Sequence, residues 1–472
     1  MKKLTSTQKF LLALILFIVL PLIYSLSIEE PEGTSVCGDF APGNVRFIRD
    51  LTYVKEGKTV HEPHILREEI ALINKAEKFI LTDMFLFNDT YNKNKDCYPN
   101  ASDSLMLALI EKKKSNPNIE IVFITDPYNE FYGSYKEKHL KEMENNGIIT
   151  IVTDLDKMRD SNPLYSGFYR VYLKWLGTGS VKWIPNPMDS TAPNINIRSL
   201  LKLLNLKANH RKTLCTDKGA IVSSANPHDP SFYHSNVAVF IESDMINDII
   251  ESERAVAKFS GIDIPKFEYK AEEKLLSDNK IRLLTDGAIG EGLKENIDKA
   301  EKGDTINIGI FYISEFELLS KLGEASHRGA NVKIIADPNK DAFGMKKNGR
   351  PNREALTKLK TNVPNVEIKW YNTTGEQYHA KIALFEFEDS NTIILGSGNY
   401  TRRNIDAYNM ESDVEIRTSK NSEISQNVTA YFDMIWNNKN GIYTVNFDKF
   451  KKESKISYLF YIVQEALGLC SW

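Results

Sequence analysis

The sequence has few cysteines, no excess of positive charge and no recognisable cofactor motif. Four cysteines among 472 residues are too few for a disulfide framework, although Cys37 and Cys97 could pair outside the cytoplasm. Cys215 lies in an apolar run and is expected to be a small buried residue. The formal charge of −3 argues against the generally basic surface of a nonspecific nucleic-acid binder. The sequence shows no glycine-rich nucleotide loop and no convincing set of metal ligands, so we expect neither a cofactor nor a metal ion.

One long apolar run stands at the N-terminus. A basic start, residues 1–9, precedes the uncharged stretch from Phe10 to Leu26. This order keeps the N-terminus in the cytoplasm and exports the rest of the chain. The run is about the minimum length for a membrane span, so we predict a transmembrane signal-anchor at 10–27. The alternative is a signal peptide cleaved near Ser25–Ser27, which would leave a secreted or periplasmic protein.

The body of the sequence is duplicated. "INKAEK" at 73–78 recurs as "IDKAEK" at 297–302, and each copy is followed by an apolar run that reads as a buried strand. "IEIVFITDPYNEFYG" at 119–133 is echoed by "VKIIADPNKDAFG" at 332–344. Stretches with helical periodicity separate these strands. Such alternation predicts an α/β layered unit with a mainly parallel sheet, present twice.

The repeat also contains a polar motif in two copies. "NHRKTLCTDKGAIVSSAN" (209–226) carries His210, Lys212, Asp217, Ser224 and Asn226, and "YHAKIALFEFEDSNTIILGSGN" (378–399) carries His379, Lys381, Glu386, Ser397 and Asn399. Side chains two apart on a strand share a face, so each histidine should project with its lysine, while Arg211 and Ala380 point away. If the halves pack with pseudo-twofold symmetry, one pocket gathers two histidines, two lysines and two asparagines.

This set of side chains suits a phosphate diester. Lysines and asparagine amides can neutralise and hydrogen-bond the nonbridging oxygens as charge builds in the transition state. One neutral imidazole attacks phosphorus, and the other, protonated, gives its proton to the leaving alcohol. We expect the motif carboxylates, Asp217 and Glu386, to bond the far ring nitrogens and so hold the correct tautomer.

The doubled motif resembles the signature of the phospholipase D superfamily, over roughly residues 45–440. The first copy fits in full, whereas the second carries Glu386 where the family has aspartate. The resemblance implies an α/β fold in which two halves, each a mixed sheet flanked by helices, fuse into one pseudo-twofold body, here 45–260 and 265–440. It also implies a metal-independent, two-step displacement through a phosphohistidine. The family's roles then fall on these residues: His210, His379, Lys212, Lys381, Asp217 and Glu386 are catalytic, and Asn226, Asn399, Ser224 and Ser397 bind phosphate. His210 is favoured as the nucleophile because its motif copy is intact.

Two apolar segments lie outside the motifs. The distance from Asp126 to His210 is 84 positions but that from Asp337 to His379 is 42, so the first half carries an insertion, at about 155–205. Its aromatic residues, interleaved with Arg and Lys, suit a membrane interface, a helix that caps the core, or the stacking of single-stranded bases. The C-terminal segment, 455–472, is read either as a helix packing its apolar face on the core or as a segment on the membrane surface.

Superfamily membership leaves the substrate open. The anchor would hold the body at a bilayer, where phospholipid is the most concentrated phosphodiester. We therefore expect phosphatidyl transfer or hydrolysis on phospholipid, as in the cardiolipin synthase and bacterial phospholipase branch, with water or an alcohol as acceptor and the body on the non-cytoplasmic side. The alternatives are an exported single-strand nuclease and a catalytically weak lipid-binding relative, the latter suggested by Glu386.

Overall fold

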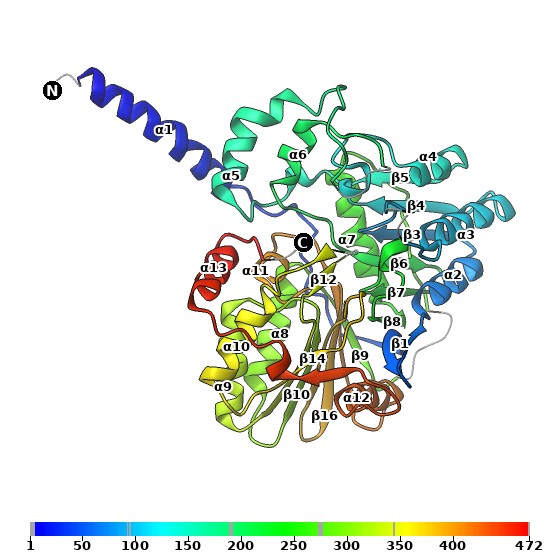
Figure 1. Ribbon diagram of the computed structural model, residues 1–472. Helices are drawn as coiled ribbons and strands as arrows, with labels where there is room; N and C mark the ends of the chain where they lie inside the picture. The colour runs from blue at the N-terminus through cyan, green and yellow to red at the C-terminus, as the bar shows by residue number, and fades with distance from the viewer. Residues whose placement is uncertain are drawn as a thin grey trace.

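The computed structural model describes residues 5–470 except 92, 94–95, 188–191, 272–276 and 343–344. In this part of the chain two similar α/β halves share one continuous sheet, with helices on its faces, and the N-terminal helix projects from the body (Figure 1). Two duplicated halves with a mixed sheet are what the repeats and the resemblance predict, and the fold class is confirmed.

The first half follows the N-terminal helix. Its elements are α1 (Ser6–Leu26), β1 (Ala41–Lys55), β2 (Lys58–Glu62), α2 (Ile65–Lys75), β3 (Phe79–Met84), α3 (Ala101–Ser115), β4 (Glu120–Thr125), α4 (Lys138–Asn145), β5 (Ile149–Val152), α5 (Pro163–Phe168), α6 (Ile197–Leu203), β6 (Lys212–Thr216), β7 (Gly219–Ser223), β8 (Asn236–Ser243) and α7 (Ile246–Phe259). Short 3-10 or π turns are η1 (Pro127–Glu130), η2 (Leu155–Lys157), η3 (Tyr169–Leu173), η4 (Lys174–Leu176) and η5 (Asp229–Ser231).

The second half repeats this order without the long insertion. Its elements are β9 (Lys280–Thr285), α8 (Gly287–Lys299), β10 (Thr305–Ile310), α9 (Phe316–Arg328), β11 (Asn331–Ala336), β12 (Asp341–Ala342), β13 (Met345–Lys346), α10 (Asn352–Asn362), β14 (Glu367–Tyr371), β15 (Lys381–Glu386), β16 (Ser390–Gly396), α11 (Arg402–Ile405), β17 (Ser412–Ser419), α12 (Glu423–Trp436), β18 (Thr444–Asn446), η6 (Phe447–Lys449) and α13 (Lys455–Ala466).

The sheet shows the duplication directly. The order β1-β8-β7-β6-β3-β4-β5 in the first half is matched by β9-β17-β16-β15-β10-β11-β14 in the second, and β1 pairs with β9 to join them. β3, β4 and β5 run parallel, as do β10, β11 and β14. The other pairings are antiparallel, because β6–β7 and β15–β16 are hairpins with tight turns. The sheet is therefore mixed, and only its outer parts follow the parallel arrangement that the helix–strand alternation predicts.

The helical stretches form where their apolar residues repeat with helical spacing. In α9 the Glu315 side chain accepts hydrogen bonds from the backbone of Glu317 and Leu318, and the helix ends at Gly329, whose φ of +105° lies in the left-handed region. The apolar side of the helix is buried against the strands. One apolar cluster spans both halves and includes Val239 and Leu395, so the halves share a core and fold as one body.

α1 and α13, the first and last helices of the described chain, lie on the same side of the body (Figure 1). α1 is 21 residues long, with a mean hydropathy of 2.5 over its most apolar window, and it is long and apolar enough to cross a membrane. Its last turns pack on α5 and η3. There the Tyr172 hydroxyl donates to the Phe17 carbonyl, and a Cβ on Gly167 would clash with the carbonyl of Pro21.

Candidate active site

The two motif histidines meet where the halves join. His210 and His379 each stand two residues before the strand that follows them, β6 or β15, and their ring centroids are 6.4 Å apart. Phe85 lies beside His210 at 4.7 Å, and Phe311 beside His379 at 4.9 Å. The two imidazoles therefore face each other across a space large enough for one phosphate group.

Each histidine is fixed by a backbone hydrogen bond to the opposite half. The His210 amide donates to the Met410 carbonyl, and the His379 amide donates to the Ser235 carbonyl, both at 2.8 Å. These bonds tie the segment before each motif strand to the segment before β17 or β8. The hydrogen bonds that join the two halves are thus the ones that hold the two histidines in place.

The duplicated Asp-Pro pairs hold the same segments from the other side. Asp126 accepts from the backbone of Asn209, directly before His210, at 2.7 Å. Asp337 accepts from the backbone of Tyr378, directly before His379, also at 2.7 Å. The repeat in the sequence marks these aspartates, and the structure shows why both copies retain them.

The partners of the imidazoles are not the motif carboxylates. His210 Nδ1 lies 2.9 Å from Glu411 Oε2, and His379 Nδ1 lies 3.1 Å from Asn236 Oδ1. The partner of each histidine comes from the opposite half, 201 and 143 residues away along the chain. One histidine therefore has a carboxylate partner and the other an amide.

The interpretation of Asp217 and Glu386 as imidazole partners is wrong. Asp217 lies in the turn between β6 and β7 and accepts from the backbone amides of Glu77 and Lys78, at 2.8 and 3.0 Å. Glu386 ends β15 and accepts from the Asn307 side chain at 2.9 Å. Each motif histidine stands just before its strand, so residues at the far end of that strand cannot reach the ring. Asp217 instead lines a separate hollow of about 750 Å³.

The motif serines also act on the partners of the histidines. Ser397 Oγ donates to Glu411 at 2.5 Å, and Ser224 Oγ donates to Asn236 at 3.1 Å. Neither serine is among the described residues that line the histidine pocket, so the expected direct contact of their hydroxyls with phosphate is not what the structure shows. The serines instead orient the groups that hold the two imidazoles.

The motif lysines lie beneath the histidines. Lys212 Nζ donates to the His210 carbonyl at 2.6 Å, and Lys381 Nζ donates to the His379 carbonyl at 2.7 Å. Burial lowers the pKa of Lys212 to about 7, and burial together with Lys212 lowers that of Lys381 well below its usual value. An anion bound between the histidines would favour both ammonium forms, so the site is arranged to take a negative charge.

Burial also sets the charge of the catalytic candidates. Desolvation, reinforced by Lys212, lowers the pKa of His210 well below 6.5, and desolvation with Lys381 does the same for His379. Burial raises the pKa of Glu411 to about 7, while Lys212 acts in the opposite direction. At neutral pH the free site therefore presents neutral imidazoles, the form that a nucleophile needs.

A pocket of about 320 Å³ opens over the two histidines. Asn226 and Asn399 line it, as expected from the motif. The backbone of Leu86 donates to Asn226 Oδ1 at 3.4 Å, which leaves the amide nitrogen to donate into the pocket. Asn399 Oδ1 is buried without a hydrogen-bond partner among the described residues. Both asparagines lie in the pocket wall, where the resemblance predicts a contact with phosphate.

Further cations and a third histidine surround the same pocket. Lys207, Lys347 and Arg403 line it. His234 lies with its ring 5.9 Å from that of His379, and its Nδ1 accepts from the backbone of Gln377. Burial lowers the pKa of His234 to about 3. The pocket thus combines an apolar wall with several positive side chains, which suits a substrate with an anionic group and an apolar part.

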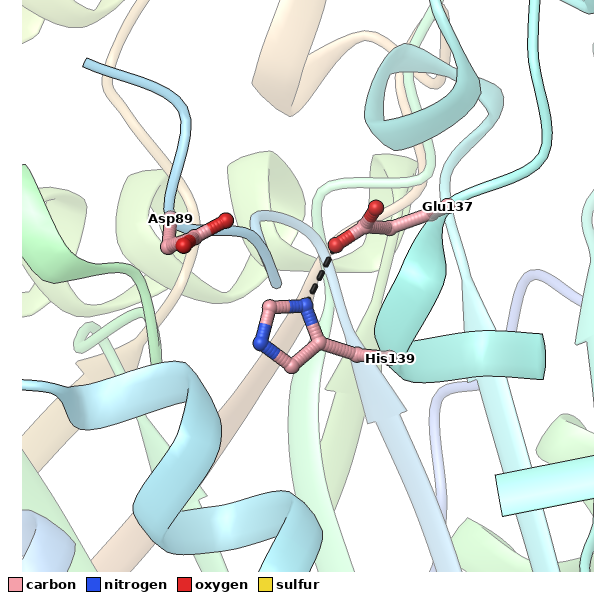
Figure 2. Close-up of side chains that lie close together, drawn as sticks. All are labelled: Asp89, Glu137 and His139. Atoms are coloured by element: carbon pink, nitrogen blue, oxygen red, sulfur yellow. Dashed lines mark hydrogen bonds and ion pairs between the residues drawn. The ribbon is translucent and has the colours of Figure 1, made fainter. Parts of the chain in front are cut away.

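A second polar cluster lies outside this pocket, in the first half. Figure 2 shows Asp89, Glu137 and His139, whose possible ligand atoms lie within 4.8 Å of one another. Asp89 pairs with Lys138 at 2.6 Å, and the His139 ring nitrogens face Glu137 and, at 2.8 Å, Asp103. These donor atoms already have protein partners, so the arrangement is that of an ion-pair network around an imidazole.

The second half of the chain matches a known family. Residues 293–436 match the family model described as "Cardiolipin synthase, PLD-like domain". The range contains the second motif copy and Glu411. No curated protein matches the chain. Residues 293–436 therefore form a phospholipase D-like domain, and the resemblance drawn from the motif is confirmed.

Solved structures extend the likeness to both halves. The fold is similar to phosphatidylserine synthase from Haemophilus influenzae Rd KW20, with a TM-score of 0.57 and 10% identity, over 90% of this chain and 94% of that one. Weaker likenesses are to polyphosphate kinase from Porphyromonas gingivalis (TM-score 0.45, 12% identity, 90% of this chain and 53% of that one) and to Nuc, a phospholipase D family member from Salmonella typhimurium (TM-score 0.27, 19% identity, 36% and 99%). At these identities the first likeness shows the fold.

Glu411 and Asn236 are the residues that the sequence analysis missed. Both stand at the start of the strand that returns from a motif hairpin, and each follows its own half's motif asparagine by about ten residues. This position in the sequence could have identified both residues as histidine partners. The correspondence is easily missed because "SNV" at 235–237 resembles "SDV" at 412–414, and that alignment pairs Asn236 with Asp413 in place of Glu411.

Proposed function

We propose that the protein is a membrane-anchored phosphodiesterase that transfers or hydrolyses phosphatidyl groups through a phosphohistidine. One observation carries the proposal. Two buried histidines from duplicated halves face one pocket, and each is held through Nδ1 by a partner from the other half. The Nε2 atoms of the two rings are then the atoms left for attack on phosphorus and for proton transfer.

The partners of the two histidines support a division of roles between them. An ionised Glu411 only accepts, so it holds the His210 proton on Nδ1 and leaves the Nε2 lone pair for attack. It also stabilises the positive ring of the phosphohistidine. The Asn236 amide nitrogen donates to the His234 carbonyl, which turns Oδ1 toward His379. An uncharged partner lets a protonated His379 release its proton more easily than a carboxylate would. His210 is therefore the nucleophile and His379 the general acid.

The reaction balances in two steps. The negative charge of the bound substrate favours the protonated form of His379, which takes up a proton from solvent. The bond from His210 Nε2 to phosphorus then forms while the bond from phosphorus to the leaving alcohol breaks, and His379 gives its proton to that alcohol. Then water or another alcohol attacks phosphorus, His379 takes its proton, and the phosphorus–nitrogen bond breaks. The two motif asparagines, which line the pocket, hydrogen-bond the nonbridging oxygens in both steps. Lys212 and Lys381, buried beneath the histidines, stabilise the developing negative charge through their own positive charge.

The substrate class rests on three supports. The matched family is described as a cardiolipin synthase domain, and the similar structure is a phosphatidylserine synthase. The pocket has an apolar wall beside its cations. The apolar helix α1 packs on the same half of the body. The nuclease remains the rival, whereas the weak lipid-binding relative loses its motive because Glu386 bonds Asn307 away from the site.

The first test compares two substrates. Purified protein in mixed micelles receives labelled phosphatidylglycerol or cardiolipin, or a labelled single-stranded oligonucleotide, with His210→Ala as the control. We expect histidine-dependent release or transfer of phosphatidyl groups, with no loss of activity in EDTA. Histidine-dependent cleavage of the oligonucleotide alone would establish the nuclease instead, and strong EDTA sensitivity would overturn the metal-independent mechanism.

We also propose the topology and the domain division. α1 is an uncleaved anchor, the two halves are 45–260 and 265–440, and the body lies on the non-cytoplasmic side. Cys37 is a free, exposed thiol just after the anchor. Because Cys97 is also a free, exposed thiol, the test uses Cys97→Ser as background. A membrane-impermeant maleimide added to intact cells is expected to label Cys97→Ser and not Cys37→Ser/Cys97→Ser. An N-terminal mass beginning near residue 27 would show a cleaved signal instead.

A further inference from the structure

Exposed apolar side chains are concentrated on two parts of the body. Among the described residues outside α1, all but two of the large exposed apolar side chains belong to the insertion or to α13 and Phe316 beside it. The two exceptions are Leu107 and Ile442. Scattered exposed apolar residues need no explanation, but such concentration marks an interaction surface.

α13 presents its apolar stripe outward. Its exposed apolar residues repeat with the spacing of one helical face and are Ile456, Leu459, Phe460, Val463 and Leu467. The opposite face is held by Tyr461 and Glu465, whose carboxylate accepts from the Ser314 hydroxyl and the Arg402 backbone, both at 2.8 Å. The interpretation in which this helix packs on the core holds for the face that carries Tyr458, Tyr461 and Ile462, while a second apolar stripe remains exposed.

The insertion lies beside α1. Phe17 stacks on Tyr172 at 4.4 Å and contacts Phe168 edge-on at 5.9 Å. Phe17 lies nine residues before Leu26, which is about 14 Å along a helix that rises 1.5 Å per residue. If α1 crosses a bilayer, the insertion beside Phe17 must lie at the depth of the lipid headgroups or below. Its most exposed aromatic residues, Trp175 and Trp183, are 79% and 63% accessible.

The C-terminal ends of α1 and α13 both contact the insertion at Asp160 and Ser161. The Ser25 hydroxyl, in the last turn of α1, donates to Asp160 at 2.6 Å. Gly468, just after α13, packs so closely on Ser161 that an added Cβ would lie 3.0 Å from its Cβ. Asp160 also pairs with Lys207, which lines the histidine pocket. α1, the insertion, α13 and the pocket wall therefore meet at one point, and α5 and α13 lie on the side from which α1 projects (Figure 1).

We propose that the insertion and α13 form a docking face for the lipid bilayer that surrounds α1. The occupant follows from α1, because the bilayer that receives this helix must meet the elements packed against it. Cations beside the apolar residues suit anionic headgroups: Lys174 and Lys182 lie in the insertion, and Arg350 lies over the Phe460 ring at 5.6 Å. Docked in this way, the protein holds its histidine pocket at the membrane surface. The inference rests on the membrane anchor of the proposed function.

Fluorescence quenching by brominated lipid tests the docking without requiring turnover. Full-length protein is reconstituted into phosphatidylcholine–phosphatidylglycerol vesicles, with or without bromine on the acyl chains. The emission of the double variant Trp175→Phe/Trp183→Phe comes from the remaining tryptophans, so its difference from wild type gives the quenching of Trp175 and Trp183. In that background Leu459→Trp reports on α13, and Leu107→Trp, an exposed position on α3, is the matched control.

We expect bromine to quench Trp175 and Trp183 and the Leu459→Trp probe at least about twofold more than the Leu107→Trp probe, since an interfacial apolar face sits at the acyl boundary. Equal, weak quenching at all positions would overturn the proposal and indicate that a protein covers this face. Strong quenching in a protein that cleaves only oligonucleotides would keep the docking face and reject the lipid substrate.

Leu459→Glu/Val463→Glu extends the test to function, with thermal melting to confirm folding. We expect about a tenfold loss of turnover on vesicle phospholipid, since added charges oppose burial in the interface. Turnover on a soluble phosphodiester should be unchanged. An equal loss on both substrates would show a structural effect and contradict the docking role.

Discussion

The two halves of the molecule share their strand order and their motif, but they differ in what they supply to the site. The second half provides a carboxylate, Glu411, for the histidine of the first. The first half provides an amide, Asn236, for the histidine of the second. The asymmetry lies at the start of the return strands, outside the recognised motif. In the proposed mechanism, two histidines at equivalent positions therefore take different roles because their hydrogen-bond partners differ.

The crosswise supply of partners has a second consequence. Each half holds its own histidine, lysine and asparagine, but the hydrogen bond to each Nδ1 crosses between halves. The backbone bonds from His210 to Met410 and from His379 to Ser235 cross in the same way. Each imidazole is oriented by a residue of the other half, so the proposed active site needs both halves.

Replacing either histidine gives the largest expected effect and tests the assignment of roles. His210→Ala and His379→Ala should each lower kcat by about 10³-fold or more, because nucleophile and general acid act as one unit. With an activated diester whose leaving group needs no proton, His379→Ala should still form labelled phosphohistidine and hydrolyse it slowly. His210→Ala should form none. Labelling quenched with alkaline detergent, in which the phosphorus–nitrogen bond survives, distinguishes them, and label retained in His210→Ala would reverse the assignment.

Changing the partners tests the asymmetry itself. Glu411→Gln removes the charge that steadies the ring of His210, and kcat should fall by about 10²-fold. Asn236→Asp adds a charge beside His379, which raises the pKa of the general acid. Its alkaline limb in the pH profile of kcat should move upward by about one unit, with a smaller loss of rate. Equal losses of kcat and unchanged pH profiles of kcat in the two variants would show that Glu411 and Asn236 act in the same way on their histidines.

The motif carboxylates should affect stability and leave turnover unchanged. Asp217→Ala removes an acceptor for two backbone amides, so the free energy of unfolding should fall by about 2 kcal/mol, with kcat within about threefold of wild type. Glu386→Asp should change neither by much, because its single bond to Asn307 is replaceable. Denaturant unfolding and turnover measure both. A large gain of activity in Glu386→Asp would instead show a decayed site.

The local sequence patterns predicted most of the fold, whereas contacts between residues far apart in the sequence could not be predicted from them. The strands before Asp126 and Asp337, the hairpins of the motif and the meeting of His210 with His379 all follow from periodicity and repetition. Glu411 could not be read in that way, because its partner is 201 residues away and the neighbouring sequence aligns out of register. α13 was hard to read for another reason: it packs Tyr461 on the core and buries Glu465 in hydrogen bonds to the body, while a second apolar stripe remains exposed.

The smallest expected effect is a pH-dependent contribution to stability, and it concerns the difference between the two halves at α4 and α10. α4 begins beside His139, held between two carboxylates, whereas α10, its counterpart in chain order, begins at Asn352, which accepts from the backbone of Ile313. Burial lowers the pKa of His139, but the bonds to Glu137 and Asp103 outweigh it and leave the pKa above 6.5. A raised folded pKa stabilises the protein below the unfolded pKa, and this stabilisation is lost as pH rises through the folded pKa.

The first half should therefore carry a pH-dependent contribution that the second lacks at this position. The free energy of unfolding of wild type minus that of His139→Gln should decrease as pH rises above 6.5, by less than about 1 kcal/mol, because Asp103 is partly exposed and screened. Urea unfolding at several pH values measures this difference, with the exposed His327→Gln as control. A difference that is constant across pH, or equal in the control, would show that His139 is not held as an imidazolium and that the cluster in Figure 2 contributes only packing.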